Sequence, residues 1–227
     1  MPSKEKTLLF TAAFFTSACS FVLVCVVLAT RSWVTSDIRF SSADSSVTVT
    51  VAYGLFQGTC EQTVTGGLQV SETSFQVADA TKNAETKAVN VAIIVLLVLA
   101  LLSSLLSAGF TGVNAVSNPY QTFLGPTGVY TWNAFNGILT LLVLILFAVN
   151  IESNGLSVEL AEVCYAISMT YTNSKNNYGY SYWIMLLIIF LNISTIIIIY
   201  FYDHARYYKK KEQERPIENA PKDVILF

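Results

Sequence analysis

Hydrophobic residues in this chain are concentrated in long uncharged runs. Charged residues are absent from 7–30, from 88–151 and from 176–202. A helix needs about 20 apolar residues to cross the hydrocarbon core of a bilayer. In the middle run, Pro119 and Pro126 place turn residues where an unbroken helix could not pass. The three runs therefore predict four membrane-spanning helices.

The predicted spans cover residues 8–29, 91–111, 129–149 and 182–202, and residues 30–88, 112–128 and 150–181 connect them. The first run could also be a secretory signal peptide. Its apolar region exceeds the roughly 7 to 15 residues usual for such peptides, which favours a retained span.

Basic residues flank the outermost spans and predict the orientation. They are Lys4 and Lys6 before the first span, and Arg206, Lys209, Lys210, Lys211 and Arg215 after the fourth. Segments rich in Lys and Arg stay in the cytoplasm. We therefore expect residues 1–7, 112–128 and 203–227 to be cytoplasmic and residues 30–88 and 150–181 to be extracellular, in a multi-pass protein of the plasma membrane.

A different pattern occupies residues 47–53, where side chains alternate at the period of a β-strand. The hydrophobic positions are Val47, Val49, Val51 and Tyr53. Further on, Gly66 and Gly67 separate two short strand-like segments, as in a hairpin with a tight turn. The first outer segment thus predicts a small antiparallel sheet, with one face packed on the helix ends and the other in water.

Residues 154–171 of the second outer segment show helical spacing, through Leu156, Leu160, Val163 and Ile167. The predicted fold is an all-α membrane protein, a four-transmembrane-helix bundle with a small extracellular antiparallel β-sheet.

The four cysteines divide by position. Cys19 and Cys25 lie inside the first span, where a thiol is most simply a small packing residue. Cys60 and Cys164 lie in the two outer segments, an oxidising setting where a disulfide can form. Spacing alone does not bring their Cα atoms within the roughly 7 Å that a disulfide needs. The sequence leaves a bridge and two unpaired thiols open, and it favours the thiols.

Small and amide residues predict how the helices associate. Ser104, Ala108 and Gly112 form a stripe along which backbones can approach, and Asn192 needs a partner near the bilayer centre. We interpret these residues as structural. A pore or proton relay is disfavoured because no ionisable residue lies inside a predicted span. The sequon at Asn192 lies inside the fourth span, so we expect no N-glycan there.

Known catalytic and ligand-binding motifs are missing from the sequence. It has no nucleophile elbow, phosphate-binding loop or zinc-protease motif, and its one histidine, His204, has no cluster of metal ligands beside it. Nor does a basic patch interleaved with aromatics indicate nucleic-acid binding. We expect a protein that is not an enzyme and has no cofactor or bound metal, with the lipid bilayer as its surroundings.

The C-terminal tail carries two candidate binding features. Its basic part fits attraction to anionic lipid, although the same charges already explain orientation. The chain ends in Ile225, Leu226 and Phe227. PDZ domains bind hydrophobic C-termini by adding the peptide to a sheet edge and capturing its carboxylate. The ending therefore predicts a PDZ scaffold as a cytoplasmic partner.

Trp33, followed by Gly54-Leu55-Phe56 and Cys60, resembles the signature of the claudin-like four-span superfamily. More specifically the whole chain resembles the clarin family, through Tyr53–Phe56, Asn118–Tyr120, Phe123–Tyr130 and the hydrophobic end Asp223–Phe227. Clarins are non-enzymatic membrane proteins associated with sensory hair cells and with organising membrane, cytoskeletal and channel complexes. This chain departs from its relatives, which carry an outer-loop sequon and more than one cysteine in the first loop.

The resemblance implies an organiser or adaptor whose outer sheet contacts a membrane-protein partner and whose tail recruits a scaffold. Two alternatives stay open. One is a claudin-like junction or adhesion component, which would use paired cysteines in the first loop. The other is an auxiliary subunit of an ion channel, packed beside the pore.

Overall fold

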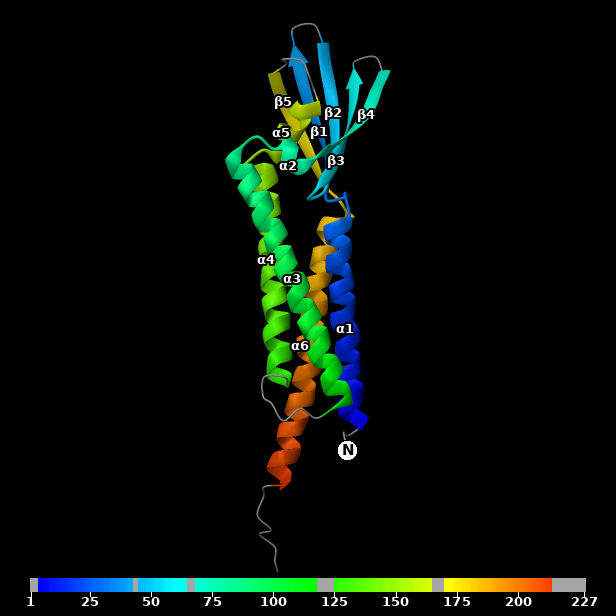
Figure 1. Ribbon diagram of the computed structural model, residues 1–227, viewed down its shortest axis with the longest axis vertical. Helices are drawn as coiled ribbons and strands as arrows, with labels where there is room; N and C mark the ends of the chain where they lie inside the picture. The colour runs from blue at the N-terminus through cyan, green and yellow to red at the C-terminus, as the bar shows by residue number, and fades with distance from the viewer. Residues whose placement is uncertain (1–3, 43–44, 65–67, 118–124, 165–169, 214–227) are drawn as a thin grey trace, which may run out of the picture.

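The structure is a computed structural model of the 227-residue chain, and it describes residues 4–42, 45–64, 68–117, 125–164 and 170–213. Within these ranges, four helices are long and apolar enough to cross a membrane: α1 (Lys4–Ala29), α3 (Ala84–Val116), α4 (Pro126–Glu152) and α6 (Tyr180–Gln213). Their number confirms the four-helix prediction. In the bundle, α1 packs against α3 and α6, and α4 packs against the same two helices (Figure 1).

Each predicted span lies inside one of these helices, and every helix extends beyond it. The largest extension is in α6, which continues to Gln213 through a segment that includes Ala205, Arg206, Glu212 and three lysines, Lys209–Lys211. These residues favour the helix in water as well as in lipid. As a result α6 projects past the other helices at the end opposite the sheet (Figure 1).

The strands form one antiparallel sheet that stands on the other end of the bundle (Figure 1). They are β1 (Val34–Ser42), β2 (Ser45–Tyr53), β3 (Gln57–Val64), β4 (Leu68–Gln76) and β5 (Thr170–Tyr178), in the order β4-β3-β2-β1-β5. The β3–β4 hairpin is present with Val64 opposite Leu68. The expected Gly66-Gly67 turn lies outside the described residues.

The predicted alternation in β2 is confirmed, since Val47, Val49, Val51 and Tyr53 are all buried on one face. That face does not lie flat on the ends of the spanning helices, as the sequence led us to expect. It packs largely on two short helices, α2 (Val77–Ala80) and α5 (Leu156–Cys164), through buried residues such as Leu156 and Leu160. The sheet therefore stands upright, with α2 and α5 between it and the bundle (Figure 1).

The second outer segment differs from its predicted helix. The helical pattern holds for α5, whereas Tyr171 lies in β5, and residue 167 is outside the described part of the chain. β5 has the sequence TYTNSKNNY, which lacks hydrophobic alternation. It forms by pairing with β1 as an edge strand, with a bulge between Arg39 and Phe40. The β5 strand therefore depends on its hydrogen bonds to β1 and not on the strand propensity of its own residues.

Candidate functional site

Trp33 stands at the junction between bundle and sheet. Its side chain is fully buried, its indole N–H donates to the Val27 carbonyl at 2.9 Å, and its ring meets Phe147 of α4 edge-on at 4.7 Å. Its backbone N–H donates to the Tyr53 carbonyl at 3.2 Å. One residue thus fixes the end of α1 to β2 and to α4.

The Gly54-Leu55-Phe56 segment follows directly and has three different environments. A Cβ atom on Gly54 would collide with the Thr30 carbonyl oxygen and lie 2.9 Å from the Arg31 Cα atom, so glycine allows two backbones to touch. Leu55 is buried, and its carbonyl accepts a hydrogen bond from the Asn90 amide of α3 at 3.2 Å. Phe56 points outward, with 48% of its surface exposed.

Phe56 lies between two cavities at the base of the sheet. One has a volume of about 490 Å³ and is bounded by the end of α1, including Cys25 and Leu28. The other, of about 190 Å³, is bounded by α3 through Val91 and Ile94. Trp33, Gly54, Leu55 and Phe56 are therefore brought together at the base of the sheet, and Phe56 has the exposed side chain among them.

A buried chain of hydroxyl groups ties α5 to the sheet. The Tyr53 hydroxyl lies 2.7 Å from Ser157 Oγ, which lies 2.9 Å from Ser36 Oγ. Ser36 in turn donates to the Asn176 side chain of β5 at 2.7 Å. Burial raises the pKa of the Tyr53 phenol far above its usual value, so the group stays protonated and acts as a structural hydrogen-bond partner.

Cys60 and Cys164 form a disulfide with their Cα atoms 6.5 Å apart. The sequence favoured unpaired thiols, and the structure shows the other alternative. The physical reason is the position of α5, which packs across the inner face of the sheet and brings its last residue to β3. Linear spacing could not reveal this approach, because 104 residues separate the two cysteines.

Of the predicted packing residues, Gly112 and Asn192 lie against a neighbouring helix, whereas the Ser104 hydroxyl bonds within its own helix. Ser104 is buried, but its hydroxyl bonds to the Leu101 carbonyl of its own helix at 2.8 Å. Gly112 faces α1, where an added Cβ would lie 3.3 Å from the Phe14 ring. Ala108 is also buried on α3, and Asn192 is buried in α6, where its carbonyl oxygen is 3.5 Å from Ser20 Oγ.

A polar cluster in the bundle centres on Ser107, which the sequence analysis missed. Its hydroxyl lies 3.0 Å from Ser17 of α1 and accepts a bond from the Asn133 amide of α4 at 2.6 Å. Nearby, Thr16 and Thr195 join α1 to α6 at 2.7 Å. Position 107 falls outside the stripe of residues spaced four apart that includes Ser104, although Ser107 is just as deeply buried.

The remaining predicted site, Ile225-Leu226-Phe227, lies outside the described residues. Within the residues that the structure does describe, no group of three or more His, Cys, Asp or Glu side chains is arranged to hold a metal ion. The candidate binding sites are therefore surfaces, above all the one around Phe56 and those at the ends of the bundle.

Comparison with known proteins agrees with this arrangement. A family model described as Clarin-2-like matches residues 5–199. The chain belongs to the clarin family. Clarin-3 of Homo sapiens and clarin-3 of Mus musculus are 45% and 47% identical to it, each over 227 residues and the full length of both chains. Clarin-1 of Rattus norvegicus is 26% identical over 206 residues, which cover 85% of this chain and 86% of the relative.

Membership in the clarin family and the four apolar helices make this a multi-pass membrane protein of the clarin type. The clarin-2-like match runs through the Trp33 junction, the Phe56 surface and the disulfide-linked sheet. It ends at residue 199, before the charged extension of α6.

Proposed function

We propose that this clarin is a non-enzymatic organiser of membrane complexes. Its outer sheet and the base of that sheet contact a neighbouring membrane protein, and its C-terminal tail recruits a PDZ scaffold. Both termini are cytoplasmic in this proposal, and the protein resides in the plasma membrane.

The exposed ring of Phe56 is the observation that carries the proposal. Gly54 contacts Thr30, the Leu55 carbonyl accepts the hydrogen bond from Asn90, and the Phe56 carbonyl accepts one from the Val77 N–H at 2.9 Å. The backbone that carries the ring is therefore fixed before any partner arrives. Rigid aromatic side chains are enriched at the energetic centres of protein interfaces because they bury area at little entropic cost. The neighbouring cavities give a partner room on both sides of the ring.

The orientation is supported by features at opposite ends of the bundle. The disulfide joins the sheet to α5, and disulfides persist on the extracellular side of the membrane. At the other end α6 carries Arg206, Lys209, Lys210 and Lys211, the kind of cluster that remains in the cytoplasm.

A second candidate function, an auxiliary subunit of an ion channel, shares the Phe56 surface. The cavity beside α3 is lined by exposed Val91 and by Ile94, both on a helix that spans the membrane, so its partner can also lie within the bilayer. Altered current kinetics on co-expression with a channel would favour this candidate over an adaptor. A junction role would instead raise transepithelial resistance.

The proposal is tested by comparing partners of four forms of the full chain, captured from polarised epithelial cells in mild detergent. They are the unchanged protein, a form lacking residues 225–227, Phe56→Ala, and the control Phe190→Ala. Phe190 is also exposed, at 64%, on the apolar face of α6.

We expect the truncation to lose a cytoplasmic scaffold and Phe56→Ala to lose a membrane protein, with Phe190→Ala matching the unchanged form. Identical partners for all four forms would refute both the tail and the Phe56 surface as working parts.

A further inference from the structure

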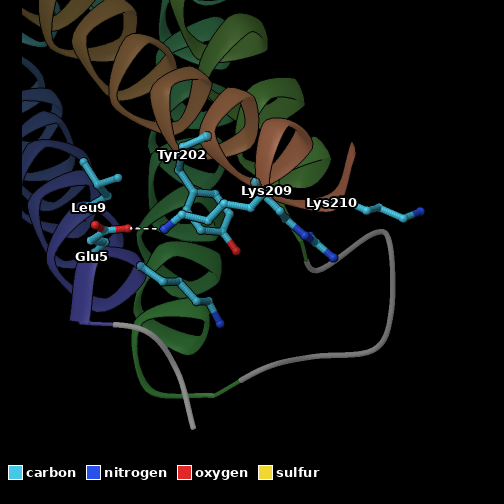
Figure 2. Close-up of a pocket in the computed structure, with 8 residues that line it drawn as sticks. Glu5, Leu9, Tyr202, Lys209 and Lys210 are labelled. Carbon is cyan, nitrogen blue, oxygen red and sulfur yellow. Dashed lines mark hydrogen bonds and ion pairs between the residues drawn. The ribbon is translucent and has the colours of Figure 1, made fainter. Parts of the chain in front are cut away.

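A cavity of about 350 Å³ lies where the start of α1 meets the last turns of α6, at the end of the bundle opposite the sheet (Figure 2). From α1 it is lined by Glu5, Lys6 and Leu9. From α6 it is lined chiefly by Tyr202, Arg206 and Lys209. The spacing of the α6 residues, at intervals of three and four, places them on one face of the helix.

Positive charge dominates this lining. Lys6, Arg206, Lys209 and Lys210 contribute four cations, against the single carboxylate of Glu5. Figure 2 shows Lys209 reaching across to Glu5, to which it is bonded at 2.7 Å. Glu5 is the one carboxylate among the described residues of this lining, so the formal charges of the lining residues sum to a positive value.

The fold places two of the cations, Lys6 and Arg206, near each other. The Lys6 ammonium donates to the Ser117 carbonyl at 2.8 Å at the end of α3, and the side chain is only 7% exposed. Arg206 is close enough to Lys6 for the two positive charges to repel. An anion between them would relieve this repulsion, and the effect is larger beside a membrane than in open water.

Part of the lining is apolar or aromatic. Leu9 and Tyr202 belong to the uncharged segments of α1 and α6, and Tyr202 packs edge-on against Phe10 at 4.9 Å. The charged residues lie on the other side, at the helix ends. With α1 and α6 spanning a bilayer, this order places the cations toward the headgroups and the apolar surface toward the acyl chains.

We propose that this cavity binds the phosphorylated headgroup of an anionic phospholipid in the cytoplasmic leaflet. The inference rests on the orientation given under the proposed function. Basic pockets between spanning helices on the cytoplasmic side suit such headgroups, because Arg and Lys bind phosphate oxygens while the acyl chains remain in the bilayer. A free phosphate shares the charge but cannot use Leu9 or Tyr202.

The test measures binding of fluorescent phosphatidylinositol bisphosphate to the full-length protein in phosphatidylcholine nanodiscs. Arg206→Gln should raise the Kd about fivefold, since a basic residue near an anionic headgroup contributes about 1 kcal/mol. The control Lys211→Gln removes the same charge from the same helix but lies outside the cavity, and it should raise the Kd by less than about twofold. Equal losses for the two variants would overturn the site in favour of a diffuse basic tail.

A second pair of variants tests shape without altering charge. Ala205 also lines the cavity, so Ala205→Trp should fill it and weaken binding at least as much as Arg206→Gln. Tyr207→Trp places the same indole at an exposed position on α6 and should bind as the unchanged protein does. Unchanged affinity for Ala205→Trp would contradict binding in the cavity.

Soluble competitors separate a lipid from a free phosphate. Inositol trisphosphate and inorganic phosphate should displace the fluorescent lipid only weakly, and displacement as effective as that by unlabelled lipid would refute the lipid assignment. Partner capture with Arg206→Gln keeps this outcome separate from the proposed function. If Arg206→Gln loses lipid binding but retains its partners, the cavity binds lipid independently of the partner surface. The proposed contact at Phe56 is tested separately by Phe56→Ala.

Discussion

The backbone at residues 30–33 is enclosed by two glycines from distant parts of the chain. Gly54 approaches it at Thr30 and Arg31, and Gly179 approaches it at Ser32. The Gly179 N–H also donates to the Trp33 carbonyl at 2.8 Å. At both contacts a side chain would meet main-chain atoms, which cannot move aside without shifting the end of α1 or the start of β1.

Gly54→Ala should therefore destabilise the protein. Forcing extra atoms into a packed site costs about 1–3 kcal/mol, and here the opposing atoms belong to backbone. Thermal unfolding in detergent should show a lower midpoint than for the unchanged protein. Gly109→Ala is the matched control, because nothing lies within 4 Å of its added Cβ and alanine favours the helix. Equal midpoints for the two variants would show that the approach at Thr30 is loose.

Ser107 and Ser104 allow a second comparison, between two serine hydroxyl groups on the same helix. Both side chains are 1% exposed on α3, but only Ser107 bonds to other helices. Ser107→Ala should reduce stability by about 1 kcal/mol, within the range measured for hydrogen bonds between membrane helices. Ser104→Ala should leave it nearly unchanged. Unfolding by increasing sodium dodecyl sulfate measures both, and a larger loss at Ser104 would reverse the assignment of the polar cluster.

At the level of helices and strands, the disulfide controls how firmly α5 is held against the sheet. Cys164→Ser should lower stability by roughly 2–5 kcal/mol, because the bridge closes a long loop and so restricts the unfolded chain. The sheet should still form with α5 packed on it, since Leu156 and Leu160 remain buried. Limited proteolysis should cleave Cys164→Ser at Lys82 or Arg39 faster than it cleaves the unchanged protein.

Cys25→Ser is the control for this change, because Cys25 is a free cysteine in α1. If reducing agent and Cys164→Ser leave proteolysis as slow as in Cys25→Ser, the bridge contributes nothing to the stability of α5 on the sheet.

The elements differ in how far local sequence determines them. Long uncharged runs predict the four helices, and the alternation through Val49 and Val51 predicts β2, because burial in lipid or on one sheet face selects those patterns directly. β5 carries Asn173 and Asn176, which disfavour strands, and it exists through pairing with β1. The disulfide and the hydrogen bonds of Ser107 depend on how elements meet in space, which residue spacing does not encode.

For the whole molecule, the orientation in the membrane can be read from an added glycan. Asn173 and Lys175 are exposed on β5, which forms one edge of the sheet. Lys175→Thr creates an Asn-x-Thr sequon at Asn173, and an extracellular sheet should then acquire an N-glycan. We expect a mobility shift that N-glycosidase removes.

The unchanged protein should show no such shift, because its sequon at Asn192 is buried in α6 with 2% of the side chain exposed. Asn173→Gln combined with Lys175→Thr should abolish the new glycan. A glycan on the unchanged protein would be incompatible with α6 as a spanning helix.

The connections from α1 to β1 and from β5 to α6 are very short. α1 ends at Ala29 and β1 begins at Val34, while only Gly179 separates β5 from α6. The Ser181 N–H also donates to the Ser32 carbonyl at 3.2 Å, which links the two connections to each other. Mechanically, the sheet is the arm of a lever, and α1 and α6 move with it. A sideways force on the sheet therefore tilts these two helices together and displaces their far ends without first stretching a linker.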